Sequence, residues 1–218
     1  MTVKAILFDI DGTLVDSNDF HADAWVEAFI AHGHDIDREK VRAQIGKGAD
    51  MLVPTLVPSA SEEWAETLGD AHGEVFKGRY LSRVRAFPHA RDLIARVHEA
   101  GLKIALASSA SKGELDHYVE LLGIAGFVDE TTTIDDVRNS KPAGDIVATA
   151  LDKLGVEAGE ALFVGDTPYD IDAGAKCGVA VIAVLSGGFS RDVLMGASAV
   201  YDDAGALLNG FPSWTGKT

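Results

Sequence analysis

The sequence predicts an α/β fold, with a doubly wound, Rossmann-like parallel sheet and a small helical cap inserted after the first strand. Three observations lead to this prediction. Short apolar runs without polar alternation recur along the chain, as in strands that are covered on both faces. Helical patterns with recognisable ends separate these runs, which implies right-handed crossovers between parallel strands. One long segment after the first run contains only helical patterns.

The predicted strands are apolar runs in which β-branched residues are common. Such runs lack the polar positions that a half-exposed strand would show, so we expect a sheet with helices on both faces. The runs cover residues 3–8, 102–107, 161–164 and 179–184, and residues 131–134 form a weaker candidate.

The helices between these strands are predicted from their ends. Pro88 begins one helix at a favoured first-turn position, and Gly101 ends it. Ser111 and Glu114 have the spacing of a capping box at the start of the next helix. Two further helical patterns cover residues 143–154 and 169–177.

The inserted segment covers residues 16–84 and contains helical patterns but no convincing strand. Ser59 and Glu62 suggest a capping box for one of its helices. We therefore predict an α/β core domain, residues 1–15 and 85–218, and a helical cap domain, residues 16–84. The last residues, 211–218, are expected to form a loose tail.

Composition limits the classes of partner. The chain has 218 residues and a formal net charge of −15, which argues against nucleic acid or an anionic membrane as its main partner. Cys177 is the single cysteine, so an intrachain disulfide is impossible. The N-terminus lacks a signal-peptide pattern, and the longest apolar run, residues 179–185, is too short to span a bilayer. We expect a soluble cytoplasmic protein that is a monomer or a weak homodimer.

Polar and charged residues follow the predicted strands. Ligands of open α/β sheets bind at the carboxyl ends of the strands, so these side chains are expected to share one site. They are Asp9, Asp11 and Thr13 after the first strand, Ser108 and Ser109 after the second, Ser140 and Lys141 after the weak candidate, and Asp166 and Asp170 after residues 161–164.

These residue types suit phosphoryl chemistry. Asp9 and Asp166 would supply oxygen ligands for Mg²⁺, which would also remove the repulsion between crowded carboxylates. Asp9 can attack phosphorus, and Asp11 can act as general acid and base. Ser108 offers a hydroxyl to phosphate oxygens, and Lys141 offers a compact positive charge.

The segments DIDGTL at residues 9–14, Ser108, Lys141-Pro142 and GDTPYD at residues 165–170 resemble the four ordered motifs of the haloacid dehalogenase-like hydrolase superfamily. The helical insert is similar to that family's first type of cap. The resemblance implies that Asp9 is the nucleophile and a metal ligand, and that Asp11 is the acid/base whose backbone carbonyl also binds Mg²⁺. It further implies that Asp166 is a metal ligand, that Asp170 supports the ligands, that Ser108 and Lys141 hold phosphate, and that Thr13 hydrogen-bonds near the aspartates.

Differences within the superfamily separate its branches. Asp11 argues against the metal-independent dehalogenases. Gly165 occupies a position where mutases similar to β-phosphoglucomutase often carry an acid, and this form is common in phosphatases. His21 and Trp25, however, lie where those mutases have a histidine and a tryptophan, which keeps the mutase alternative open.

The expected reaction is Mg²⁺-dependent hydrolysis of a small phosphorylated metabolite through an aspartyl-phosphate. Ser109 is expected to support Ser108, and the cap residues His21 and Lys47 are expected at the substrate cleft. A sugar-phosphate mutase on the same fold is one alternative. A non-catalytic, receiver-like phospho-aspartate switch is another, although receivers lack a large helical insert after the first strand.

Overall fold

The computed structural model describes residues 3–216, and within them the core is a six-stranded sheet of order β5-β4-β1-β6-β7-β8. All neighbouring strands pair in parallel. Each predicted run overlaps a strand, so the doubly wound sheet is confirmed. The three residues of β8 have no counterpart in the prediction, because their apolar run is very short and only half-buried. The strands are β1 (Ala5–Phe8), β4 (Lys103–Ala107), β5 (Glu130–Thr132), β6 (Ala161–Gly165), β7 (Ala180–Val184) and β8 (Ala199–Tyr201).

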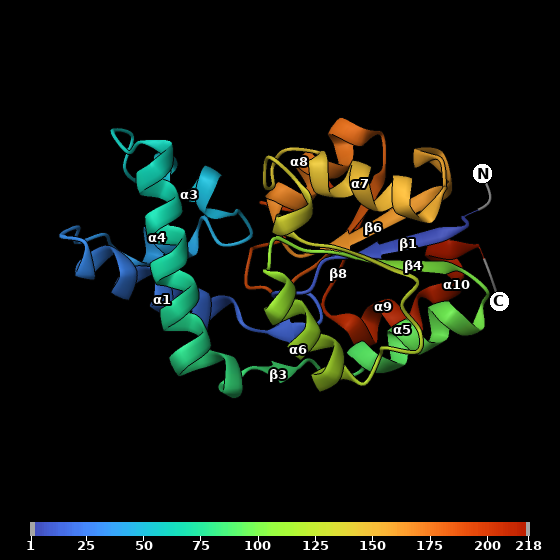
Figure 1. Ribbon diagram of the computed structural model, residues 1–218. Helices are drawn as coiled ribbons and strands as arrows, with labels where there is room; N and C mark the ends of the chain where they lie inside the picture. The colour runs from blue at the N-terminus through green and yellow to red at the C-terminus, as the bar shows by residue number, and fades with distance from the viewer. Residues whose placement is uncertain (1–2, 217–218) are drawn as a thin grey trace.

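Helices cover both faces of the sheet (Figure 1). Alternate residues of β1 show why both faces are apolar: Ile6 and Phe8 join one hydrophobic cluster, whereas Ala5 and Leu7 join another. One face carries α7 (Asp145–Leu154) and α8 (Pro168–Cys177), and the other carries α5 (Ala90–Glu99), α6 (Lys112–Leu122), α9 (Ala204–Asn209) and α10 (Phe211–Thr215). The short 3₁₀ turns are η3 (Ile134–Asp136) and η4 (Ala158–Glu160).

The central strands end in register. Phe8 lies opposite Leu106 of β4 and Val164 of β6. The residues that follow these positions therefore emerge at one edge of the sheet. The strand order also reverses at β1, and such a switch point is where open α/β sheets bind ligands.

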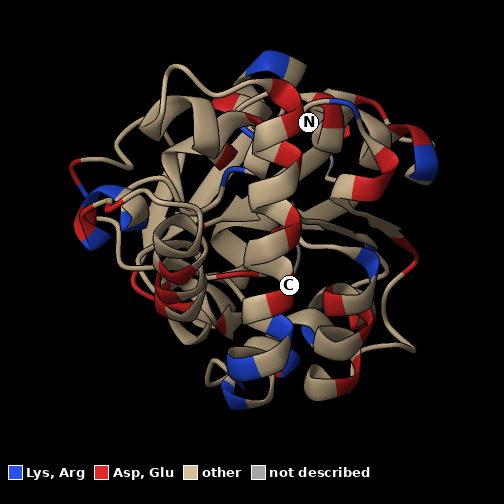
Figure 2. Ribbon diagram, turned by 60° about the vertical axis from the view of Figure 1, so that its left-hand side comes forward, with Lys and Arg blue, Asp and Glu red and all other residues tan. Residues whose placement is uncertain are grey.

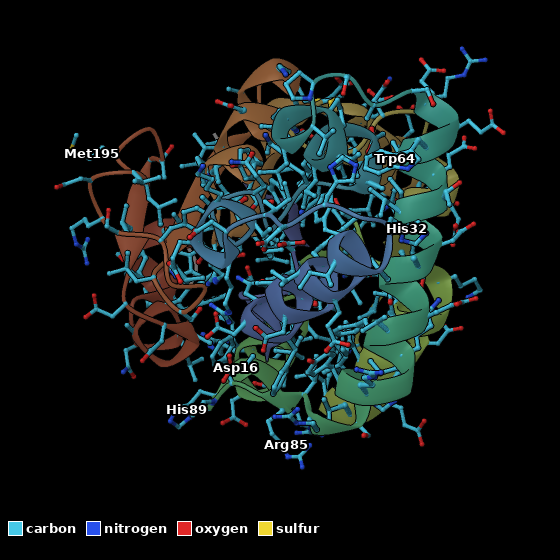
Figure 3. The ribbon with its side chains drawn as sticks, turned by 90° about the vertical axis from the view of Figure 1, so that its left-hand side faces the viewer. Asp16, His32, Trp64, Arg85, His89 and Met195 are labelled. Carbon is cyan, nitrogen blue, oxygen red and sulfur yellow. The ribbon has the colours of Figure 1, made fainter. Side chains whose placement is uncertain are left out.

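The segment after β1 forms a helical body to one side of the sheet (Figure 1). Where the chain leaves the sheet and returns to it, β2 (Val15–Asp16) and β3 (Arg85–Ala86) pair antiparallel. Figure 3 shows Asp16 and Arg85 of this pair at one end of the molecule, away from Trp64. The helices are α1 (Asn18–Ala31), α2 (Arg38–Arg42), α3 (Ala49–Leu56), α4 (Glu62–Val75), the π-helical turn η1 (Phe76–Tyr80) and the 3₁₀ turn η2 (Leu81–Arg83).

Two local predictions were wrong. Ser61, not Ser59, caps α4, because its hydroxyl accepts a hydrogen bond from the amide of Trp64 at 3.2 Å. The expected loose tail instead contains α10, whose Phe211 is buried, and residues 217 and 218 lie outside the described residues, as do 1 and 2. The capping box of Ser111 and Glu114 is confirmed.

The charge is spread over the surface. Acidic residues occur on many elements and are interspersed with lysine and arginine (Figure 2). None of the helices within residues 3–216 is long and apolar enough to cross a membrane.

Candidate active site

A cavity of about 490 Å³ lies between the inserted helices and the carboxyl edge of the sheet. The sheet side contributes Asp9, Asp11 and the loop of residues 108–111, and the helical side contributes His21, Lys47 and His72, among others. Residues far apart in the sequence therefore face one space. Its size suits a small metabolite.

Asp9 and Lys141 form a buried ion pair beneath this cavity. Lys141 Nζ lies 2.6 Å from Asp9 Oδ1 and 2.7 Å from Asp170 Oδ1. Burial alone would lower the pKa of Lys141, but the two carboxylates raise it, so the lysine stays charged. Asp170 is held in turn by the capping box of α8, in which the hydroxyl of Thr167 donates to Asp170 Oδ2 at 2.6 Å.

Asp166, the residue after β6, is fully buried, and both of its oxygens have a donor. Thr13 Oγ1 donates to Oδ1 at 3.1 Å, and Asn18 Nδ2 donates to Oδ2 at 2.9 Å. Gly187 packs directly against this carboxylate, since a Cβ atom there would lie 1.6 Å from Asp166 Oδ2. The side chain of Asp166 is therefore fixed from three sides.

Asp9, Asp166 and Asp170 offer oxygen atoms that all lie within 4.8 Å of one another. Burial raises the pKa of Asp9 to about 7, and neighbouring carboxylates add to the effect while Lys141 opposes it. Burial, together with the charges of Asp170 and Asp9, raises the pKa of Asp166 well above its usual value. One ammonium thus faces three carboxylates, and this excess of buried negative charge and oxygen donors fits a divalent cation.

The amide oxygen of Asn18 is a second observation that fits a cation with bound water. This oxygen is buried and has no hydrogen-bond partner among the described residues. Its orientation is fixed, because the amide nitrogen donates to both Asp166 and the carbonyl of Gly187. Such an oxygen can accept a hydrogen bond from a metal-bound water molecule.

The carboxylate of Asp11 lies outside this cluster and belongs to the cavity wall. Its Oδ1 accepts from Ser17 Oγ at 2.5 Å and lies 3.1 Å from His21 Nε2. Burial alone would raise its pKa, but the charge and hydrogen bond of His21, with hydroxyl donors, lower it overall. Asp11 is therefore an ionised group poised beside the cavity.

The remaining predicted residues divide between the cavity and its support. Ser108 is fully buried, and its hydroxyl accepts from the amide of Ala110 at 3.0 Å. Ser109 and Lys47 line the cavity, and Lys47 Nζ donates to Gln44 Oε1 at 2.6 Å. Thr13 contacts Asp166 and does not line the cavity, so its position fits support of a ligand better than contact with substrate.

Two residues make contacts at the site that the sequence analysis did not predict. Asn18 was not named there, because it has an ordinary position at the start of α1 and only the fold brings it to Asp166. Ser140 was named with Lys141, but no partner was assigned to it. Ser140 precedes Lys141, and its amide donates to Asp50 Oδ2 at 2.9 Å, while its hydroxyl accepts from the amide of Gly48 at 2.8 Å. Its place next to Lys141 was the available signal for Ser140, whereas no local signal marks Asn18.

Comparisons with known proteins agree with this geometry. The family described as "Haloacid dehalogenase-like hydrolase" matches residues 6–184. A phosphoglycolate phosphatase from Rhodospirillum rubrum is 30% identical over 222 residues, which cover 96% of this chain and 92% of that protein. A pyrophosphatase PpaX from Oceanobacillus iheyensis is 29% identical over 188 residues, which cover 84% of each chain.

Solved structures are similar over almost the whole chain. A hydrolase from Pseudomonas syringae superposes with a TM-score of 0.91 at 28% identity, covering 97% of this chain and 98% of that one. A β-phosphoglucomutase from Clostridium difficile has a TM-score of 0.84 at 21% identity, covering 98% and 97%, and this likeness concerns the fold alone. The resemblance predicted from four short motifs is thereby confirmed.

Proposed function

The chain belongs to the haloacid dehalogenase-like hydrolase family and is a phosphatase, and from this premise we propose that it hydrolyses a small phosphate monoester through an aspartyl-phosphate on Asp9. One observation carries the proposal: Asp9 lines the cavity, pairs with Lys141 and lies in one carboxylate cluster with Asp166. In this proposal residues 16–84 are the cap, and residues 1–15 and 85–218 are the core.

Asp9 would attack phosphorus, form a bond to it and release the alcohol. Lys141 and Ser108 would hold the phosphoryl oxygens and offset their developing negative charge. Mg²⁺, held by Asp9, Asp166 and the backbone carbonyl of Asp11, would supply further positive charge there. Asp170 would keep Lys141 in place, because it contacts the same ammonium group from the other side.

Asp11 would donate a proton to the leaving oxygen and then accept one from the water that cleaves the aspartyl-phosphate. Its lowered pKa suits the second role. In the first role, the negative charge of a bound phosphate beside Asp11 would raise that pKa and favour the protonated form. Closure of the cap would exclude bulk water from both steps.

The mutase alternative has less support from this chain. A Cβ atom at Gly165 would lie 2.5 Å from Asp170 Cγ, so an acid at this position would displace the side chain that holds Lys141. His21 contacts Asp11, and this contact remains the feature that the alternative would use. The receiver-like alternative is not supported by the large helical body after β1.

We infer that the partner is a small phosphorylated metabolite in the cytoplasm, and that the chain is a monomer or a weak homodimer. The names of the relatives make phosphoglycolate and pyrophosphate the first candidates for testing. The volume of the cavity also admits a sugar phosphate or a nucleoside monophosphate.

The test is a phosphate-release screen over these compounds with Mg²⁺ or with a chelator. We expect release with Mg²⁺ only and no turnover for Asp9→Asn, while Asp16→Asn, an exposed acid nearby, serves as the matched control and stays active. Full activity of Asp9→Asn would exclude the nucleophile assignment. Conversion of a hexose 1-phosphate to the 6-phosphate without free phosphate would establish the mutase instead.

A further inference from the structure

His21 is held by a partner at each ring nitrogen. Its Nε2 lies 3.1 Å from Asp11 Oδ1, and its Nδ1 lies 3.2 Å from Nε2 of His72. Because a carboxylate only accepts hydrogen bonds, the proton between His21 and Asp11 belongs to Nε2. Turning the ring over would break both contacts, so the contact with His72 fixes which nitrogen faces Asp11.

The two histidines belong to a reciprocal stack between α1 and the helical segment α4–η1. His21 stacks on Phe76 with ring centroids 3.8 Å apart and planes at 11°, and His72 stacks on Trp25 at 4.3 Å and 11°. Each helix contributes residues four positions apart, which lie on one face. His72 is therefore itself held in place and can define the position of its neighbour.

Because His21 is buried, loss of its contact with His72 would be costly. His21 is 8% exposed, and without His72 its Nδ1 would lose the partner that now lies beside it in the interior. A buried nitrogen without a partner is costly, so the ring would shift toward another one. Any such shift moves Nε2 away from Asp11, which lies on the other side of the same rigid ring.

We propose that His72 is a positioning residue of the reaction, which holds His21 so that His21 in turn orients the carboxylate of Asp11 toward the leaving group. This inference rests on the function proposed above, in which Asp11 is the general acid. It adds a residue of α4 to the site, so that two cap helices together support a core residue. His72 is not required to touch the substrate for this role, although it lines the cavity.

Two variants separate the hydrogen bond from the stack. His72→Phe keeps an aromatic ring against Trp25 but removes the contact with Nδ1 of His21, whereas His72→Gln keeps a polar group that can replace it. His34→Phe is the matched control, because His34 also lies against a tryptophan of the cap, Trp64, with centroids 4.8 Å apart, and does not line the cavity. Thermal unfolding shows whether each variant is folded.

The test compares two substrates with different leaving groups. Phosphoglycolate needs a proton on its leaving alkoxide, whereas p-nitrophenolate leaves without one. Because kcat/KM covers the steps up to formation of the phosphoenzyme, we expect His72→Phe to lose about tenfold in kcat/KM with phosphoglycolate and less than about twofold with p-nitrophenyl phosphate. His72→Gln and His34→Phe should stay within about threefold of wild type with both.

Three results would overturn the inference. Equal losses with both substrates would mean a general structural role, and a raised KM with unchanged kcat would mean direct contact with substrate. A His72→Phe variant that is as active as wild type would show that the contact does not matter. If wild type releases phosphate from these esters and only the His72 result fails, the proposed function still holds. Failure of wild type to release phosphate from any compound of the screen, p-nitrophenyl phosphate included, would contradict both.

Discussion

Lys141 and Asp9 form an ion pair in which the ammonium lies 2.6 Å from the carboxylate and the two side chains are 1% and 4% exposed. Asp170 contacts the same ammonium. Loss of Lys141 would leave both carboxylates buried without a positive charge, and an unpaired buried charge is expensive. In the proposed mechanism Lys141 therefore serves both the stability of the fold and the reaction.

Lys141→Met tests this connection. The substitution leaves Asp9 and Asp170 without their common partner, so we expect kcat/KM to fall by roughly 10² to 10³. The free energy of unfolding should fall by about 3–5 kcal/mol. Phosphate release and urea denaturation measure the two effects. Lys112→Met is the control, since this exposed lysine pairs with Asp116 on the surface, and both quantities should hardly change. Unchanged activity of Lys141→Met would contradict the assigned role.

The raised pKa of Asp9 predicts how the metal-free protein depends on pH. Burial moves this pKa from 3.8 to about 7, and Asp166 shifts in the same direction. Between these pH values the folded state therefore binds more protons than the unfolded state. The contribution of these two carboxyl groups to stability in chelator should accordingly fall as the pH rises from about 4 to about 7.

Asp9→Asn removes the titrating group and should melt at a higher temperature than wild type in chelator near pH 8. The difference in melting temperature between the two proteins should be several degrees, since 1 kcal/mol corresponds to about 2–4 °C for a chain of this size. This difference should shrink toward pH 4. Addition of Mg²⁺ should raise the melting temperature of wild type again, because its intact Asp9 carboxylate then binds the ion. A variant that melts below wild type in chelator near pH 8 would refute the predicted sign.

Asn18→Ala tests the support of Asp166. Its amide donates to Asp166 Oδ2 and to the carbonyl of Gly187, so its loss frees a carboxylate that is otherwise fixed. We expect the Mg²⁺ concentration for half-maximal activity to rise by roughly 10- to 100-fold. Asn209→Ala, at the exposed end of α9, should leave it unchanged. An unaltered metal requirement in Asn18→Ala would separate this residue from the metal site.

Asp50→Ala tests the contact between the cap and the segment that carries Lys141. Asp50 accepts the amide of Ser140, and loss of one charged hydrogen bond should lower kcat/KM by about tenfold. Steady-state kinetics measure the effect. Asp35→Ala is the control, because Asp35 is an exposed acid of the cap. Equal kinetics of the two variants would mean that this contact does not support the segment that carries Lys141.

Most of the fold could be predicted because buried parallel strands and capped helices have strong local signals. The run before Asp9 and the capping box at Ser111 are examples. The motif residues could also be placed at one edge, since parallel strands end together. The short strand β8 and the helix α10 lack such signals, and packing against the core determines them.

The supporting residues of the site could not be predicted in the same way. Asn18 and Asp166 lie far apart in the sequence, as do His21 and His72, and the contacts appear only when the helices pack. Nothing in the local sequence distinguishes His72 from a solvent-exposed histidine. The motif residues can thus be predicted from the sequence, whereas the residues that position their side chains become visible only in the tertiary structure.

The most direct measurement of the central claim is the location of the phosphoryl group during turnover. Asp11→Asn should slow hydrolysis of the phosphoenzyme, so reaction with p-nitrophenyl phosphate and Mg²⁺, acid quenching and peptide mass spectrometry should trap it. The account predicts one added phosphoryl group on the peptide that contains Asp9, and none on that peptide in Asp9→Asn. A phosphoryl group on any other residue, or turnover by Asp9→Asn, would contradict it.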